Sequence, residues 1–317
     1  MKMDYASIAP LVQSSEQKGT VLTVVFQAGS SGTPVGASAR LERSKDLAGA
    51  TRATAQRKLL SNLGFAISRA VNGALGDVNM LSKFAGGHAR SAVESLTASI
   101  DSKYSDAEKQ NAIVQAFRSV SDRFQWDGTA WVHAGETAAP RGEFSEQLDA
   151  APIADKADLV VLARMLAELA AADGEVGDDE RQFLATFLPA ELEVDALLDG
   201  PALTDGDLRA ASEGQVRETM LMLAWGLCFS DDELADEEQE ACRRFARGLG
   251  ISVARGKAMR NAAAGFVLEH AFADSWSGGV PNEARRTEAF AAADRLGLPQ
   301  PVARRIESQY KRRHGIS

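Results

Sequence analysis

Cysteine is scarce in this 317-residue sequence, which contains only two. Cys228 and Cys242 are 14 positions apart, and no histidine lies near either of them at the spacing of a metal ligand. Two cysteines cannot build a disulfide framework, and this pair lacks the repeated ligand spacing of a zinc motif. Because free cysteine is commonly buried, both residues are predicted to be small members of a hydrophobic core.

Long hydrophobic runs are also absent. No stretch approaches the roughly 18 uninterrupted apolar residues that a membrane-spanning helix needs. The first residues do not form a basic start followed by an apolar core, as a secretory signal would. The sequence therefore predicts a protein without a transmembrane segment and with a cytoplasmic location.

The residues that carry most enzyme chemistry are rare and isolated. The sequence contains no G-x-S-x-G, H-E-x-x-H or P-loop signature. Paired carboxylates could serve a glycosidase, but such a site needs aromatic platforms, and Trp225 is the only tryptophan between residues 155 and 245. We therefore expect a protein that is not an enzyme. The four histidines, none in a nucleophile or metal motif, are His88, His133, His270 and His314.

Positive charge is scarce in the middle of the chain. Residues 155–245 contain 7 Lys and Arg against 23 Asp and Glu, a balance of −16, whereas residues 1–154 are almost neutral with 16 against 15. Residues 246–317 reverse the sign, with 12 basic against 6 acidic residues. Because phosphate contacts require positive charge, nucleic acid is not expected as a partner. A divalent cation, a basic protein or the basic C-terminal segment would complement the acidic region.

The first region of regular structure is a β-branched segment. Residues 20–28 are rich in valine and threonine, residues 29–36 are rich in glycine and serine, and residues 37–43 partly alternate between apolar and polar. This order predicts a β-hairpin. The connecting loop lacks the Lys-Ser/Thr pair that a phosphate-binding loop requires.

Two helices are predicted to follow. Apolar residues at intervals of three and four favour a helix within residues 46–75, although its glycines weaken the prediction. Ser105 and Glu108 match a capping box, so a second helix is expected to begin there. The predicted buried face of this second helix is Ile113, Phe117, Val120 and Phe124.

The domain boundary is predicted near residue 150. Asp127-Gly128 indicates a tight hairpin turn, which completes an α+β domain of unknown role over residues 1–150. Residues 133–154 are predicted to be a linker, because proline, glycine, alanine and charge replace periodic apolar positions there. From Asp158 onward every periodic segment favours helix. The expected fold is therefore an all-α domain over residues 151–317, preceded by the smaller α+β domain.

An acidic turn occurs twice between apolar helices of this second domain. Residues 171–180 read AADGEVGDDE, and residues 229–238 read FSDDELADEE, 58 positions later. This internal repeat predicts that Val176 and Leu234 attach each turn to the core while the acidic groups face outward. In register, five residues of the first turn match five of the second: Asp173, Glu175, Val176, Asp178 and Glu180 match Asp231, Glu233, Leu234, Asp236 and Glu238.

A third, weaker copy of the pattern follows. Residues 278–283 precede another helix, and RLGL at residues 295–298 is similar to RGLGI at residues 247–251. This copy has lost most of the carboxylates, so no site is predicted in it.

At these acidic turns the chain resembles the TerB-like family, which is named for tellurite resistance. The hallmark of that family is an alanine-rich helix that runs into Asp-Gly-x-hydrophobic-x-x-x-Glu, followed later by a related turn. The resemblance covers about residues 155–265, and it implies an all-helical bacterial protein with a metal-linked role in stress resistance. The residues that match the first motif are Asp173, Gly174, Val176 and Glu180.

The second turn departs from the family pattern at two positions. Asp232 stands where the family usually has glycine, and Ala235 replaces the serine or threonine that often caps the next helix; Gly177 makes the same replacement in the first turn. Capping is therefore expected from Asp178 and Asp236 or from the backbone.

The predicted metal ligands are four carboxylates that would converge from the two turns. Hard oxygen ligands suit Ca²⁺, Mg²⁺ or Mn²⁺, and no organic cofactor is expected. An EF-hand is excluded, because its bidentate glutamate position is occupied by Leu184 in the first turn and by Cys242 in the second. The predicted set is Asp173, Glu180, Asp231 and Glu238, with Glu175 and Glu233 outside it.

Two other interpretations of the same residues remain open. Acidic residues in the first turn of a helix are stabilised by its positive end, so the turns could be purely structural. An acidic helical domain could also dock a basic protein, which would make the chain an adaptor or scaffold. The expected function is a non-enzymatic stress-response protein that binds a divalent cation, with the adaptor as the alternative.

Overall fold

Two hydrophobic cores organise the chain, one in an N-terminal α+β region and one in a larger helical region. A computed structural model describes residues 3–18, 20–29, 33–41, 60, 63–64, 67, 104–127, 130–134, 142–172, 176, 181, 184, 194–230, 234–276 and 281–316. Among these residues, no helix combines the length and the apolar character that crossing a membrane requires.

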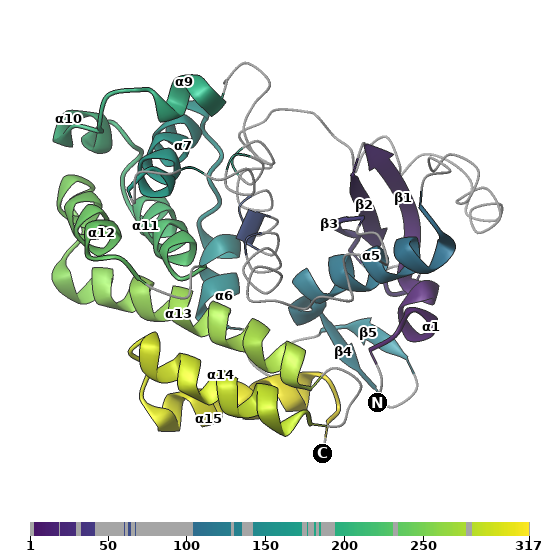
Figure 1. Cartoon of the computed structure of the whole chain (residues 1–317). Coiled ribbons are helices and arrows are strands. Elements are labelled where there is room, and N and C mark those ends of the chain that lie inside the picture. The colour runs from purple at the N-terminus through teal and green to yellow at the C-terminus, as the bar shows by residue number, and fades with distance from the viewer. Residues whose placement is uncertain are drawn as a thin grey trace.

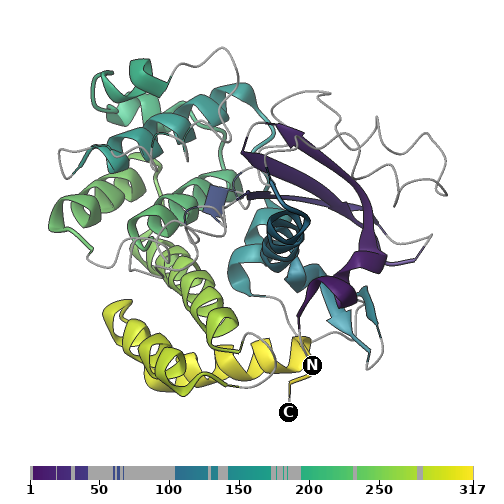
Figure 2. The same ribbon diagram turned by 45° about the vertical axis from the view of Figure 1, so that its right-hand side comes forward.

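The α+β region begins with a three-stranded antiparallel sheet in the order β1-β2-β3 (Figure 1). The predicted hairpin is confirmed, because Leu22 pairs with Ala39 and Val24 with Ala37 across its two strands. One face of the strands is covered by a helix, α5, which Figure 2 shows lying across the sheet. The elements are α1 (Tyr5–Ile8), η1 (Ala9–Leu11), β1 (Val12–Lys18), β2 (Val21–Phe26) and β3 (Val35–Arg40).

The sequence did not predict β1. Its residues, VQSSEQK, are mostly polar and lack the β-branched run that marks β2. Because β1 has only one paired neighbour among the described strands, its polar side chains need no apolar surroundings. Its register with β2 shifts between Val12 and Ser14, which bends the strand near its start.

Helix α5 (Asp106–Ser119) begins where the capping box predicts. Ser105 accepts the N–H of Glu108 at 3.3 Å, and Glu108 accepts the N–H of Ser105 at 2.8 Å. The predicted face is buried, although the helix stops at Ser119 and Phe124 lies in the next strand. The rings of Phe26, Phe124 and Trp131 pack around that of Phe117 and form the centre of the first core.

A second hairpin follows α5, as the sequence predicts. After η2 (Ser121–Arg123), β4 (Phe124–Trp126) pairs with β5 (Trp131–His133). Trp126 pairs with Trp131, and the N–H of Asp127 donates to the Ala130 carbonyl at 3.0 Å; Gly128 lies outside the described residues. Asp127 contributes through its side chain, which accepts the N–H of Ala130 at 2.8 Å.

The segment predicted as a linker contains a helix. In α6 (Glu143–Ala150), Phe144 and Leu148 lie one turn apart and are buried in the second core, as is Ile153 beyond its end. So few apolar positions cannot produce a periodic pattern in the sequence. Of the helix predicted within residues 46–75, the described residues Leu60, Leu63 and Ile67 also belong to this second core.

The helical region contains every described helix after α6, and no strand lies in its described residues, as the sequence predicts. The leucine stripe of α7 is buried, and so are both cysteines. Its helices are α7 (Lys156–Ala170), α9 (Val194–Leu198), α10 (Asp205–Arg209), α11 (Gln215–Cys228), α12 (Asp236–Gly248), α13 (Val253–Ser275), α14 (Glu283–Arg295) and α15 (Gln300–Arg313).

Helix α11 occupies the centre of this region. All residues from 219 to 230 are buried, because α6, α7, α12 and α13 pack around it. Gly226 lets the side chain of Leu63 approach the middle of the helix, since a Cβ there would lie 2.9 Å from the Cδ1 of Leu63.

Three helices end in the same left-handed glycine turn. Gly250 after α12, Gly297 after α14 and Gly315 after α15 have φ values of 71°, 70° and 62°, a conformation that favours glycine. The residue after each glycine donates its N–H to a carbonyl five positions earlier, which satisfies a helix end. The similarity between residues 247–251 and 295–298 therefore corresponds to one repeated helix ending. These bonds join Ile251 to Ala246 (2.9 Å), Leu298 to Ala293 (2.8 Å) and Ile316 to Lys311 (2.9 Å).

An arginine caps two of these ends in the same way. Arg217 of α11 donates to the Leu249 carbonyl at the end of α12, at 3.1 Å. Arg260 of α13 donates to the Leu296 carbonyl at the end of α14, at 3.2 Å. The pairs α11/α12 and α13/α14 are therefore antiparallel hairpins of the same design, and the weak third copy in the sequence is a structural repeat.

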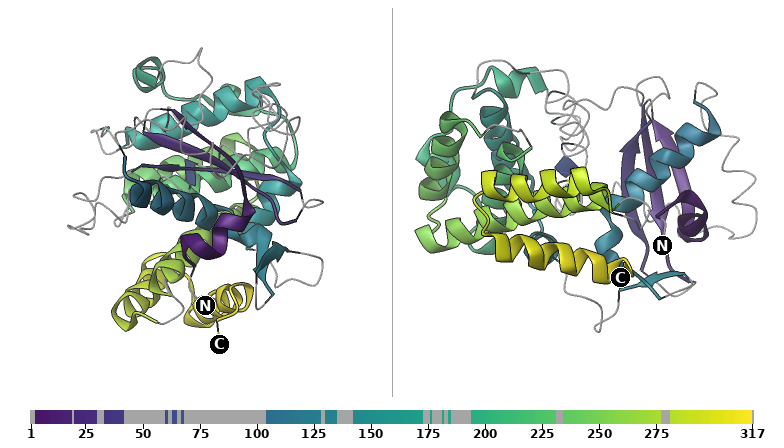
Figure 3. Two further views of the ribbon diagram at one scale, coloured as in Figure 1. Left: turned by 90° about the vertical axis from the view of Figure 1, so that its right-hand side faces the viewer. Right: turned by 60° about the horizontal axis from the view of Figure 1, so that its bottom comes forward.

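The two regions meet at the C-terminal end of α15. Figure 3 shows α13, α14 and α15 roughly side by side, with the C-terminus beside the β4–β5 hairpin. His314 is buried there, with its ring stacked on that of Tyr310 at a centroid distance of 4.1 Å and edge-to-face with that of Trp131 at 5.6 Å. Arg118 of α5 forms an ion pair with Asp274 of α13 across the same junction. Burial lowers the pKa of His314 from 6.5 to about 4.

We predict opposite effects for alanine at two helical glycines. A Cβ at Gly248 would overlap with the side chain of Leu208, so Gly248→Ala should destabilise the protein by about 1–3 kcal/mol. A Cβ at Gly256 would meet its nearest atoms at 3.9 Å, so Gly256→Ala should stabilise it by up to about 1 kcal/mol. Urea unfolding of both variants tests the packing of α10 against α12, which would be refuted by wild-type stability in Gly248→Ala.

A second prediction concerns pH. Because the pKa of His314 is lower in the folded protein than in the unfolded chain, the unfolded chain takes up the proton first as the pH falls. The folding stability that the neutral, buried His314 contributes is complete above pH 6.5. It is lost as the pH falls from 6.5 to about 4. His314→Phe, which cannot titrate, should remove a loss on the order of 3 kcal/mol from the pH profile of unfolding. Identical slopes for variant and wild type between these pH values would contradict the assignment.

Candidate functional site

The helices that precede the two acidic turns run in the same direction. The N–H of Ser212, just before α11, bonds to Oδ1 of Asp158 in the first turn of α7 at 2.7 Å. The hydroxyl of Thr219 in α11 bonds to the Ala151 carbonyl just before α7 at 2.9 Å. The N-terminal ends of α7 and α11 therefore lie together, and Figure 2 shows the two helices side by side.

Their C-terminal ends consequently lie at the same end of the helical region. The helices have 15 and 14 residues, so they rise by nearly the same length. Packed helices have axes about 8–10 Å apart. The described backbone runs to Ala172 after α7 and to Ser230 after α11. The two acidic turns thus start from neighbouring helix ends.

The prediction that one apolar residue attaches each acidic turn to the core is confirmed. Val176 and Leu234 are partly buried and pack against the second core. Three of the four predicted ligands, Asp173, Glu180 and Asp231, lie outside the described residues. Among the residues that the structure does describe, no group of three or more His, Cys, Asp and Glu side chains is arranged to hold a metal ion.

Glu238, the described member of the predicted set, has a structural role. It is 7% exposed, and its Oε2 accepts the N–H of Ala235 at 3.0 Å. Ala235 occupies the N-cap position of α12, where it offers no side-chain acceptor, so Glu238 satisfies the helix end from the third helical position. The expected capping by Asp236 is not observed, because Asp236 is already the first residue of the helix.

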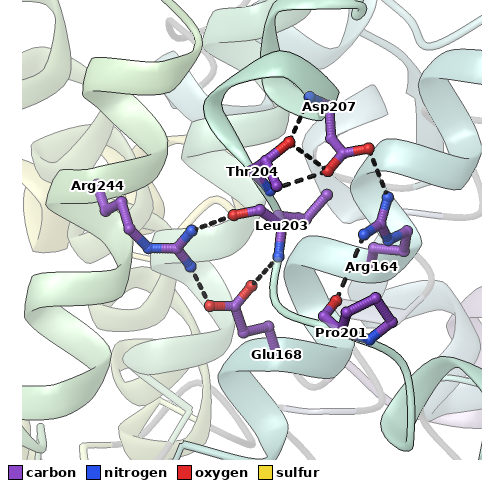
Figure 4. A network of polar contacts seen from close by, with 7 residues as sticks. All are labelled: Arg164, Glu168, Pro201, Leu203, Thr204, Asp207 and Arg244. Carbon is purple, nitrogen blue, oxygen red and sulfur yellow. Dashed lines mark hydrogen bonds and ion pairs between the residues drawn. The ribbon is translucent and has the colours of Figure 1, made fainter.

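A polar network fixes α12 and α10 against the C-terminal half of α7 (Figure 4). Arg244 of α12 forms an ion pair with Glu168 of α7 and donates to the Leu203 carbonyl at 2.6 Å. Glu168 in turn accepts the N–H of Leu203 at 3.1 Å. Arg244 and Glu168 are both largely shielded from solvent. Through their hydrogen bonds to Leu203, they also attach the segment before α10 to α7 and α12.

The second half of the network holds the start of α10. Arg164 donates to Oδ1 of Asp207 at 3.0 Å and to the Pro201 carbonyl at 3.4 Å. Thr204 and Asp207 form a capping box, and its hydrogen bonds, together with Arg164, lower the pKa of Asp207 to about 2. The Thr-x-x-Asp spacing is visible in the sequence and could have predicted this helix start. Nothing local predicts the arginine partners, which are 43 and 76 positions from their carboxylates.

The described histidines make hydrogen bonds to backbone carbonyls. His133 contacts the Thr33 carbonyl at 3.0 Å, His270 the Phe266 carbonyl at 2.9 Å, and His314 the Tyr310 carbonyl at 2.8 Å. Each of these contacts holds a ring in place within the fold.

Neither a scan of protein-family models nor searches of curated proteins and solved structures found a match to this chain. The TerB-like resemblance therefore stays a prediction that rests on the residues of the two acidic turns.

Substitutions at two neighbouring positions test whether Glu238 caps α12, because Glu237 beside it is exposed. Glu238→Ala removes the carboxylate that accepts the Ala235 N–H at the start of α12 and should cost about 1–2 kcal/mol of folding stability. Glu238→Gln keeps an oxygen for the Ala235 N–H and should lose much less. Glu237→Ala, on the exposed side of the same turn, should change stability by no more than about 0.5 kcal/mol.

Chemical denaturation measures all three variants. If Glu238→Ala and Glu237→Ala proved equally stable, Glu238 would not be the residue that caps α12.

Proposed function

We propose that this protein is a non-enzymatic stress-response protein, similar to tellurite-resistance proteins of the TerB-like kind, whose two acidic turns together bind one divalent cation. The observation that carries the proposal is the common direction of α7 and α11, because the turns start from neighbouring helix ends. The expected ligands are Asp173, Glu180, Asp231 and Glu238.

Electrostatic repulsion supports a bound cation. Two unit charges about 10 Å apart repel by about 2 kcal/mol at an effective dielectric constant of 20. The sequence places eight carboxylates within residues 173–180 and 231–233, directly after helix ends that lie side by side. A divalent cation between the turns offsets this repulsion and links the two helix hairpins.

The chemistry of the ligands favours a hard ion. Carboxylate oxygens are the preferred ligands of Ca²⁺, Mg²⁺ and Mn²⁺, and a site that draws on several residues suits the variable coordination of Ca²⁺. The hydrogen bond from Ala235 to Glu238 is compatible with this role, since an ionised carboxylate has further acceptor capacity.

The proposal predicts an ion-dependent increase in thermal stability. Ca²⁺, Mg²⁺ or Mn²⁺ at about a hundred times its dissociation constant should raise the melting temperature of the full chain by about 5 °C or more. Asp173→Asn/Asp231→Asn should abolish this shift, because it removes one proposed ligand from each turn.

A charge-matched control separates binding from general electrostatics. Asp236→Asn/Glu237→Gln also removes two negative charges, from exposed positions in the first turn of α12, and should retain the shift. Absence of a shift with all three ions in the wild-type protein would refute the proposal, and so would equal loss of the shift in the control.

The adaptor remains the second candidate because of the repeated hairpins. Stacked helix hairpins such as α11/α12 and α13/α14 form extended surfaces that commonly bind other proteins. The excess of acidic residues within residues 155–245 would fit a basic partner. Salt-sensitive retention of a basic protein, combined with no response to divalent ions, would favour the adaptor over the cation site.

A further inference from the structure

The two cysteines of the chain are in contact although they belong to different helices. Cys228 is the last residue of α11, and Cys242 lies in the second turn of α12. Their Sγ atoms are 3.4 Å apart, and both thiols are free and fully buried. Because these are the only cysteines of the sequence, neither has another intramolecular partner.

The helix hairpin explains this contact. Cys228 and Cys242 are each seven positions from Ala235, the N-cap of α12. Seven residues are close to two helical turns, so a residue before the connection and one after it can face each other across the antiparallel helices. This symmetry is visible in the sequence once the start of α12 is known.

Both ends of the hairpin hold the thiols in place. Glu238 caps α12 beside the cysteines, and Arg217 fixes the opposite end of α12 to α11 through the Leu249 carbonyl. The apolar neighbours of the pair belong to the second core. The thiol contact is therefore a property of the packed hairpin and does not depend on chance side-chain positions.

The distance is short enough for a covalent bond. A disulfide has an S–S length of about 2.05 Å, so the sulfur atoms need to approach by roughly 1.3 Å from their present separation of 3.4 Å. Rotation about χ1 together with a small shift of α12 supplies such a movement without separating the helices.

We infer that Cys228 and Cys242 form a redox-active pair, which a hydroperoxide oxidises to a disulfide between α11 and α12 at the base of the second acidic turn. This inference does not rest on the proposed cation site. From composition alone the two cysteines are expected only to fill the core, whereas the inference assigns them a reversible oxidation.

The chemistry balances with one peroxide for each disulfide. The thiolate of one cysteine attacks a peroxide oxygen, the O–O bond breaks, and a sulfenic acid and hydroxide form. The second thiol then attacks the sulfenic sulfur, the S–O bond breaks, and water leaves. Two thiols are oxidised and hydrogen peroxide is reduced to two waters. A dithiol reductant reverses the reaction by exchange.

The environment makes the pair slow to react at neutral pH. The hydrogen bond with Cys242 raises the pKa of Cys228, and burial and the charge of Glu238 raise it further. Because the thiolate is the reactive form, the pair is expected to remain reduced at low peroxide and to react faster as the pH rises. Access of the oxidant requires opening of the hairpin near the turn.

The disulfide would restrain the second acidic turn. It closes a loop from Cys228 to Cys242 that contains the whole connection between the helices. Closing a loop of about 15 residues restricts the unfolded chain and stabilises the folded protein. Oxidation therefore couples peroxide chemistry to the stability of the turn that carries Asp231.

Treatment of the full-length protein with hydrogen peroxide, followed by removal of the oxidant, tests the inference. Intact mass spectrometry should show a loss of two hydrogen atoms, and thiol titration after denaturation should fall from two thiols to none. Proteolysis without reductant should yield one peptide pair joined through Cys228 and Cys242. The melting temperature should rise by about 5 °C or more and return after treatment with dithiothreitol.

Two variants and two alternative products make the test decisive. Cys228→Ala and Cys242→Ala should show neither the mass loss nor the reversible rise in melting temperature. Unchanged mass under conditions that oxidise a small-molecule thiol completely would overturn the inference. Addition of oxygen to the cysteines, or consumption of both thiols in covalent dimers, would overturn it as well.

Discussion

The burial of α11 on every side sets the positions of the helices around it. Among the described elements, α6, α7, α12 and α13 pack around it, and apolar side chains of all four belong to the same core. An apolar helix of this kind is stable only when all these neighbours are present. The requirement fixes α7 parallel to α11 and α12 antiparallel to it, and so brings the ends of α7 and α11 and the start of α12 to one end of the region.

Not every acidic residue within residues 155–245 is a free charge on the surface. Several of its carboxylates hold specific partners: Asp158 accepts a backbone N–H, Glu168 and Asp207 bond to arginines, and Glu218 pairs with Arg255. Among these groups, the hydrogen bonds from Thr204 and Arg164 lower the pKa of Asp207. A charge count over residues 155–245 therefore mixes structural carboxylates with those available to a ligand.

Sequence reasoning succeeded where local chemistry decides the structure. The capping box at Ser105 and the β-branched hairpin are local features, and the fold follows both. The prediction failed where contacts between distant residues determine the structure. Strand β1 forms because β2 supplies a hydrogen-bonding partner, and α6 forms because Phe144 and Leu148 pack into the second core. The same limit applies to the candidate site, since Glu238 could be recognised as acidic but its engagement with Ala235 depends on where α12 begins.

Arg260 connects the two helix hairpins physically. Its guanidinium lies 5.5 Å from the ring centroid of Trp225 and 5.1 Å from that of Phe229, while it also donates to the end of α14. One side chain thus touches the first hairpin and caps the last helix of the second. In a stack of repeats, such shared contacts act as nearest-neighbour coupling. The hairpins are consequently expected to melt as one cooperative unit, because Arg260 adds to the direct packing of α13 against both α11 and α14.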